Sequence, residues 1–155
     1  LTFLTATRES GGRLCWRGEW ACVRPYVAPD RYGRAQKYTL RPDAEVRYSG
    51  PGGHIPTFLE VDRGQESARR LAGKIDHYYD YRDSADCDDL TVLLATPGPG
   101  RSDGPLARAR AIAWERRVPL LDLRTTTATD LAARGPWAPI WRDAHGAIGF
   151  LDVWS

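Results

Sequence analysis

Three carboxylates are spaced so that they could meet around one metal ion. Glu60 and Asp62 are two positions apart in a stretch with β-strand composition, and alternation along a strand sends both side chains to one face. Asp43 begins an earlier stretch that a hairpin could bring alongside. Carboxylate oxygens favour Mg²⁺ or Mn²⁺, and such an ion polarises a phosphodiester and activates water. The alternative interpretation is a solvated hairpin face, because alternating polar residues are common on strands.

The flanking residues predict the elements that would position these carboxylates. Asp43 to Tyr48 alternates with period two, which predicts a strand, and residues 49–53 (Ser-Gly-Pro-Gly-Gly) predict a turn. Ile55 to Asp62 predicts the second strand of the hairpin. From Gln65 to Tyr81, apolar residues recur every three and four positions, which predicts an amphipathic helix packed on the sheet.

The remaining segments extend the same pattern. We expect one or two strands in residues 13–26, a loop over 27–42 that ends in a short strand near 37–40, and a buried strand at 90–95. A helix over 105–117, a strand over 118–123 and a closing hairpin around Trp137, Trp141 and Phe150 follow. A strand meander followed by crossovers predicts an α/β (α+β) fold, with a mixed central sheet flanked by helices.

Length and composition exclude several protein classes. The chain has 155 residues, of which 42% are hydrophobic and 27% charged, so we expect one globular domain over residues 1–155 rather than a disordered chain. No apolar stretch is long enough to span a bilayer, and no leader opens the sequence. The odd count of three cysteines indicates reduced thiols and a cytoplasmic protein. The chain starts at Leu1 and has no methionine, so we expect a fragment.

The basic residues are unevenly distributed. The net charge is only +2, yet residues 1–41 hold eight basic and three acidic residues. Nearly all the basic residues are arginines, whose guanidinium group suits contacts with phosphate. A GC-rich genome would also enrich arginine, so the composition permits a nucleic-acid partner without requiring one.

Several strings together resemble the replication-relaxation family of actinobacterial plasmids and mobile elements. The resemblance spans roughly residues 14–95, and its most specific part is the order and separation of two acidic motifs. The matching residues are Trp16–Glu19, Leu40–Ala44, Phe58–Gly64, Ser67, Lys74 and Tyr78.

The resemblance implies a restriction-endonuclease-like PD-(D/E)xK core, usually preceded by an N-terminal winged helix that would be missing here. It also implies a role in plasmid replication, relaxation or conjugative mobilisation, with DNA and relaxosome proteins as partners. On this mapping Asp43 and Glu60 are the two motif carboxylates, and they would bind the ion together with Asp62.

Asp62 stands where the PD-(D/E)xK pattern expects a lysine, two positions after Glu60. Lys74 is either the relocated catalytic lysine or a solvated helix residue. Arg63 is a nearer substitute for that cation, and Glu19 could supply a further carboxylate from the first strand.

Three functions remain open at this point. The first is a metal-dependent DNA endonuclease or nickase, and the second is a catalytically inactive DNA-binding or scaffold module of a relaxosome-type complex. The third is a protein-interaction domain that recruits a separate relaxase. Tyr78, Tyr79 and Tyr81 could include a nucleophile, but aromatic residues at helical spacing more often pack in a core.

Overall fold

The computed structural model describes residues 13–49 and 56–149. Seven strands form one sheet in the order β1-β4-β5-β6-β7-β8-β9. The central pairs β5–β6 and β6–β7 are parallel, whereas the pairs on either side are antiparallel, so the sheet is mixed as predicted. The strands are β1 (Arg13–Gly18), β4 (Ala44–Ser49), β5 (Pro56–Val61), β6 (Thr91–Thr96), β7 (Asp122–Thr127), β8 (Trp141–Arg142) and β9 (Ile148–Gly149).

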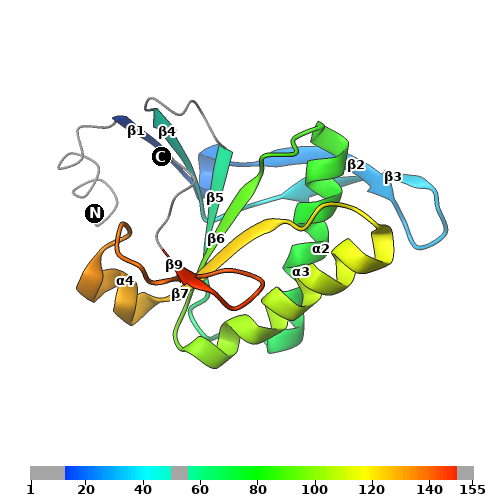
Figure 1. Cartoon of the computed structure of the whole chain (residues 1–155). Coiled ribbons are helices and arrows are strands. Elements are labelled where there is room, and N and C mark those ends of the chain that lie inside the picture. The colour runs from blue at the N-terminus through cyan, green and yellow to red at the C-terminus, as the bar shows by residue number, and fades with distance from the viewer. Residues whose placement is uncertain (1–12, 50–55, 150–155) are drawn as a thin grey trace.

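Helices flank this sheet, which confirms the predicted mixed α/β architecture (Figure 1). The long helices α2 (Ala68–Ala85) and α3 (Asp103–Arg116) pack side by side over one face. Ser67 caps the start of α2 by accepting a hydrogen bond from the Arg70 amide. The shorter elements are the helix α4 (Ala128–Arg134) and the 3₁₀ turns η1 (Glu19–Ala21) and η2 (Pro99–Ser102).

Hydrophobic clusters cover both faces of the sheet. Val92 and Leu94 of β6 pack in the larger cluster with α2 and α3, whereas Leu93 between them faces a smaller cluster around Trp141. Because both faces of β6 are buried, the strand is apolar along its length, as expected of a central parallel strand. Trp141 is buried on β8, which pairs antiparallel with β9 where the sequence predicts a closing hairpin.

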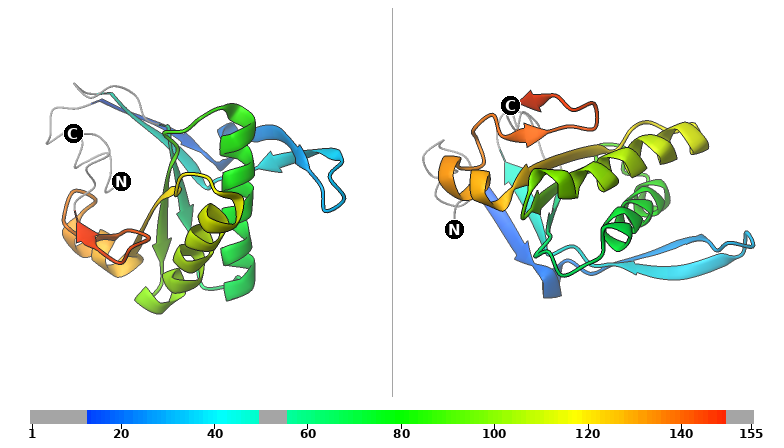
Figure 2. Two further views of the ribbon diagram at one scale, coloured as in Figure 1. Left: turned by 45° about the vertical axis from the view of Figure 1, so that its right-hand side comes forward. Right: turned by 90° about the horizontal axis from the view of Figure 1, so that it is seen from below.

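A second, two-stranded sheet projects from the body. It consists of β2 (Arg24–Pro29) and β3 (Ala35–Leu40), and Figure 2 shows it extending beyond the helices. The predicted loop was therefore wrong for residues 27–29 and 35–36, which are strand, whereas the short strand predicted near 37–40 is confirmed as part of β3. The ribbon is stable because one side, with Tyr26 and Leu40, is buried and belongs to the α2–α3 cluster.

The C-terminal third differs from the prediction in two further ways. Strand β7 spans Asp122–Thr127 rather than residues 118–123, because its pairing with β6 begins at Thr91 and Asp122 and continues through three threonines of high β-propensity. The helix α4 was not predicted. The predicted turn after Ser49, and Phe150 of the predicted closing hairpin, lie outside the described residues.

None of the described helices is long and apolar enough to cross a membrane. All three cysteines are free thiols, as predicted.

Candidate functional site

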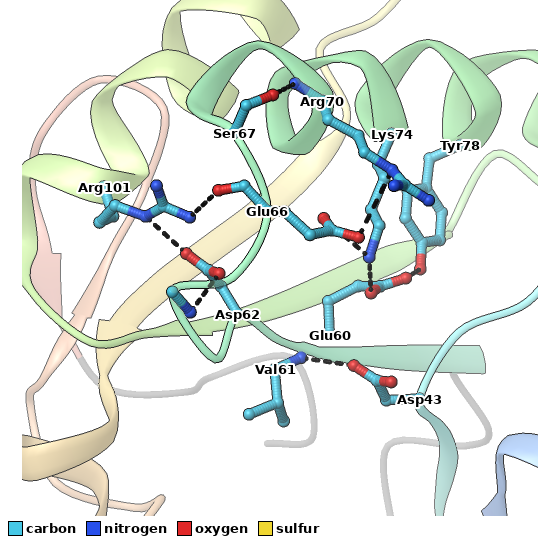
Figure 3. A network of polar contacts seen from close by, with 11 residues as sticks. Asp43, Glu60, Val61, Asp62, Glu66, Ser67, Arg70, Lys74, Tyr78 and Arg101 are labelled. Carbon is cyan, nitrogen blue, oxygen red and sulfur yellow. Dashed lines mark hydrogen bonds and ion pairs between the residues drawn. The ribbon is translucent and has the colours of Figure 1, made fainter.

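The β4–β5 pairing sets the position of the two motif carboxylates. Ala44 pairs with Leu59, and continuing that antiparallel register by one residue places Asp43 opposite Glu60. Asp43 Oδ2 accepts a hydrogen bond of 2.7 Å from the Val61 amide, which fixes the carboxylate against β5 (Figure 3). The predicted hairpin is therefore present, and it places the start of β4 beside the end of β5.

Glu60 is a buried carboxylate with two side-chain donors. Its side chain is only 7% exposed. Lys74 Nζ lies 3.0 Å from Oε2, and the Tyr78 hydroxyl donates to Oε1 at 2.6 Å. Burial raises the pKa of Glu60, the charge of Lys74 and the Tyr78 hydrogen bond oppose that rise, and the charge of Asp43 adds to it. Glu60 thus carries an imperfectly compensated negative charge next to a second carboxylate.

Lys74 reaches this carboxylate because α2 crosses back over β5. The lysine lies six residues after the start of the helix, or about 9 Å along its axis. Its Nζ also lies 3.4 Å from a Glu66 oxygen. Burial lowers the pKa of Lys74, but Glu60 and Glu66 outweigh burial, so the net shift is upward and the amine stays protonated. The side chain of Lys74 is 35% exposed, so it is partly open to solvent.

Asp62 points to the same side of β5 but has a different partner. Its side chain has no exposed surface, and its oxygens accept from Arg101 Nε at 2.7 Å and from the Gly64 amide at 2.8 Å. The hydrogen bond from Arg101 lowers the pKa of Asp62 despite the opposing effect of burial. Arg101 also donates to the Glu66 carbonyl at 2.8 Å. Asp62 therefore ties the β5–α2 loop to η2.

The turn after Asp62 requires Gly64, which has a φ of +77°. Gly64 therefore serves as the turn residue between β5 and α2.

The two lower-ranked candidates lie apart from these contacts. Arg63 is exposed in the β5–α2 loop. Glu19 is exposed in η1, immediately after the first strand rather than on it. In the part of the chain that the structure describes, neither side chain forms a hydrogen bond or ion pair with Asp43, Glu60 or Asp62.

The three tyrosines of α2 are packing residues. Tyr78 and Tyr79 are fully buried, and Tyr79 donates to the Ala109 carbonyl and accepts from the Leu121 amide. Burial raises the pKa of Tyr78 well above its usual range, and the negative charge of Glu60 reinforces the effect. The phenol thus stays protonated and serves as a donor to Glu60.

Another buried carboxylate, Glu45, was missed by sequence reasoning. It lies two residues after Asp43, and its side chain is 2% exposed. Three arginines surround it: Arg24 in direct contact, Arg47 with Nε at 2.7 Å and Arg17 at 3.9 Å. The sequence shows that Glu45 follows Asp43 by two positions on the same predicted strand. Its arginine partners could not be predicted, because they come from three strands, β1, β2 and β4.

The described residues do not form the compact three-carboxylate cage that the sequence suggested. Within residues 13–49 and 56–149, no three His, Cys, Asp or Glu side chains are grouped so that they could hold a metal ion. Asp43 and Glu60 lie opposite each other at the β4–β5 pairing, close enough for the charge of Asp43 to raise the pKa of Glu60. Mg²⁺ commonly uses only one or two carboxylates and completes its coordination with water and substrate phosphate, so a pair is chemically sufficient.

Comparison of the sequence with known protein families gives a match. A replication-relaxation family profile matches residues 2–93, more than half of the chain. The chain belongs to the replication-relaxation family. In this replication-relaxation protein the match includes Asp43, Glu60, Asp62 and Lys74, and it ends within β6, before Arg101. Membership supports a role in plasmid replication or relaxation. Neither a curated protein nor a solved structure matches the chain.

Proposed function

We propose that the protein nicks or cleaves DNA during plasmid replication, relaxation or conjugative mobilisation. Its active centre would consist of Asp43, Glu60 and Lys74 on a PD-(D/E)xK-type core. The observation that carries this proposal is the 3.0 Å contact between Lys74 and Glu60. That contact supplies from α2 the cation that the motif lacks at position 62.

The residues fit a divalent ion as a pair of ligands. Asp43 and Glu60 would hold Mg²⁺ or Mn²⁺, which, when bound, would polarise the phosphodiester and lower the pKa of a water molecule. We assign Asp62 to the contact with Arg101 rather than to the ion, because both of its oxygens already accept hydrogen bonds from the protein.

The protein's own groups would position the substrate and balance its charge. The Tyr78 hydroxyl holds one oxygen of Glu60, so this carboxylate keeps one orientation when DNA approaches. Lys74 remains protonated, so it would act as a cation toward the phosphate rather than as a base. Because the Lys74 side chain is partly exposed, it would approach a phosphate oxygen without a rearrangement of α2.

An inactive DNA-binding or scaffold module of a relaxosome-type complex is the second candidate. The observation in its favour is that each predicted carboxylate already has a partner in the protein: the Val61 amide for Asp43, Lys74 for Glu60 and Arg101 for Asp62. A site that was retained for structure alone would show the same contacts.

A plasmid-nicking assay distinguishes the two candidates. We expect the chain to convert supercoiled plasmid to the open circle with Mg²⁺ or Mn²⁺, and Asp43→Asn to lower the rate at least about a hundredfold. Asp88→Asn is the matched control, because Asp88 is an exposed acidic residue in the distant α2–β6 loop. If wild-type protein retards the plasmid on a gel but nicks it with neither ion, the inactive module is the correct function.

A further inference from the structure

We propose that the β2–β3 ribbon is a DNA-binding arm whose tip contacts the phosphates of a duplex held at the Asp43–Glu60 centre. The choice of DNA as partner rests on the proposed function. The interaction surface comprises the exposed residues of the turn between the strands together with Lys37 on β3. None of these residues belongs to the candidate active centre.

The arm has the shape and the attachment that this role needs. Its six-residue strands extend about 20 Å at the usual rise per residue. A two-stranded ribbon is narrow enough to enter the major groove of a duplex. Strand β3 ends at Leu40, three residues before Asp43, so the arm leads directly into the site. DNA that contacts the arm would therefore run toward the two carboxylates.

The base of the arm is fixed to the body. Tyr26 Oη and His77 Nδ1 are hydrogen-bonded at 2.7 Å, and the Tyr26 ring stacks on Tyr38 with centroids 5.5 Å apart. The Val27 amide donates to the Ser84 hydroxyl at 3.4 Å. Because α2 carries both His77 and Ser84, the arm has a defined direction relative to the helix that supplies Lys74.

The tip concentrates positive charge around an exposed ring. Tyr32 is 63% exposed, and the guanidinium carbons of Arg31 and Arg34 lie 4.6 and 5.3 Å from its ring centroid. Asp30 shapes the turn by accepting hydrogen bonds from the Tyr32 and Arg34 amides. The ring thus holds two guanidinium groups together, and neither forms an ion pair with any other described residue. Closely spaced unpaired guanidinium groups are suited to adjacent phosphates.

The opposite side of the arm explains which face DNA would use. On the α2 side, the nearby carboxylates are Asp80 and Asp83, and Arg116 pairs with both at 2.6 and 3.9 Å. Those carboxylates would repel a phosphate. Lys37 is exposed on the side of the ribbon opposite the buried ring of Tyr26. That outer side is the face that we assign to DNA.

A further protein strand is a poor fit for the same arm. Pro25 and Pro29 lack the amide hydrogens that strand addition along β2 would use. Lys37 stands in the middle of β3, where a charged side chain discourages edge-to-edge pairing. The edges are therefore protected, while the charges at the tip remain available to phosphate.

The test is duplex binding by the full chain, measured by fluorescence anisotropy over a salt series. We expect Arg31→Gln/Arg34→Gln to weaken binding roughly tenfold and to reduce the slope of log K against log salt by about two. Arg117→Gln/Arg134→Gln removes the same charge from exposed arginines outside the ribbon and should have little effect. Thermal unfolding of both double variants checks that each is folded.

Substitution of Tyr32 tests the role of the ring. Tyr32→Leu keeps both charges, so we expect the salt slope to stay unchanged and affinity to fall by no more than about threefold. Tighter binding of a matching single strand than of the duplex, with most of that binding lost in Tyr32→Leu, would show base stacking and overturn the duplex assignment. If Arg31→Gln/Arg34→Gln binds the duplex with the same affinity as the control Arg117→Gln/Arg134→Gln, the proposed DNA-binding role of the arm is wrong.

The outcomes separate this inference from the proposed function. If the protein nicks plasmid and the tip variant binds DNA normally, the DNA-binding role of the arm is wrong and the nuclease function is retained. If the tip substitutions weaken DNA binding but no nicking occurs with either ion, the DNA-binding role of the arm is supported and the nuclease function is wrong.

Discussion

Glu45 and Glu60 are buried carboxylates on neighbouring strands, yet their surroundings differ in charge. Three arginines surround Glu45, so its negative charge is fully balanced and it connects β1, β2 and β4. Glu60 has one lysine, one phenol and the nearby charge of Asp43. The first arrangement satisfies a carboxylate, whereas the second leaves negative charge that a cation could balance. The proposed function therefore assigns Glu60 to the active centre and Glu45 to the structure.

The largest expected effect is the loss of nicking in Glu60→Gln, for which Glu45→Gln is the comparison. Glu60→Gln keeps the shape of the side chain but removes charge from the proposed ligand pair, so the nicking rate should fall at least about a hundredfold. Glu45→Gln should retain the rate of the wild type within a few-fold when rates are corrected for folded protein. Equal losses in both variants would remove the distinction between the two glutamates.

Stability should respond in the opposite order. Glu45→Gln leaves three arginines without their shared counter-ion, and because these arginines are partly exposed we expect a loss of only about 2 kcal/mol. Glu60→Gln removes a charge whose burial is unfavourable, so this variant should be at least as stable as the wild type. Urea unfolding at neutral pH measures both changes. A larger loss in Glu60→Gln would identify Glu60 as the structural residue.

Asp62 provides an intermediate case, because its arginine contact should make stability depend on pH. The pKa of Asp62 is lowered in the folded protein, so the ionised group contributes stability above its unfolded pKa of about 3.9. That contribution is lost as pH falls through the folded pKa. Asp62→Asn should therefore cost about 1–2 kcal/mol at pH 7, and the difference from wild type should shrink below about pH 4. A difference that is constant from pH 7 to pH 3 would contradict the ionic contact.

The smallest effect is expected from Tyr78→Phe. The change removes one hydrogen bond to Glu60 and leaves the ring in the core, so we expect about 1 kcal/mol of lost stability. Nicking should fall only a few-fold, because Lys74 still holds the other oxygen of Glu60. A loss of nicking as large as that of Glu60→Gln would instead indicate that the phenol takes part in the reaction.

Local periodicity was sufficient to predict the elements that carry the site. The alternation after Asp43 corresponds to β4, and the three–four spacing after Gln65 corresponds to α2. The β2–β3 ribbon could not be predicted in the same way. Pro29 and Gly33 favour a loop locally, and the buried side of the ribbon is recognisable only when α2 is known to cover it.

The contacts of the predicted site residues depend on the tertiary fold and could not be predicted from local sequence. The sequence left a catalytic and a solvated Lys74 equally open, and the direction of α2 across the sheet brings this lysine to Glu60. Arg101 follows β6, far from Asp62 in sequence, and the two meet because parallel β5 and β6 end at the same edge. By contrast, the start of α4 carried a local signal, since Thr127 and Asp130 form a capping pair three residues apart.

The central claim is that Asp43 and Glu60 share a cation that Glu45 does not need. Mn²⁺ soaked into crystals of the protein tests it directly through anomalous scattering. We predict one Mn²⁺ peak in contact with the carboxylates of Asp43 and Glu60, and none beside Glu45. Density without Mn²⁺ at this pair, with Lys74 still bound to Glu60, would contradict the account.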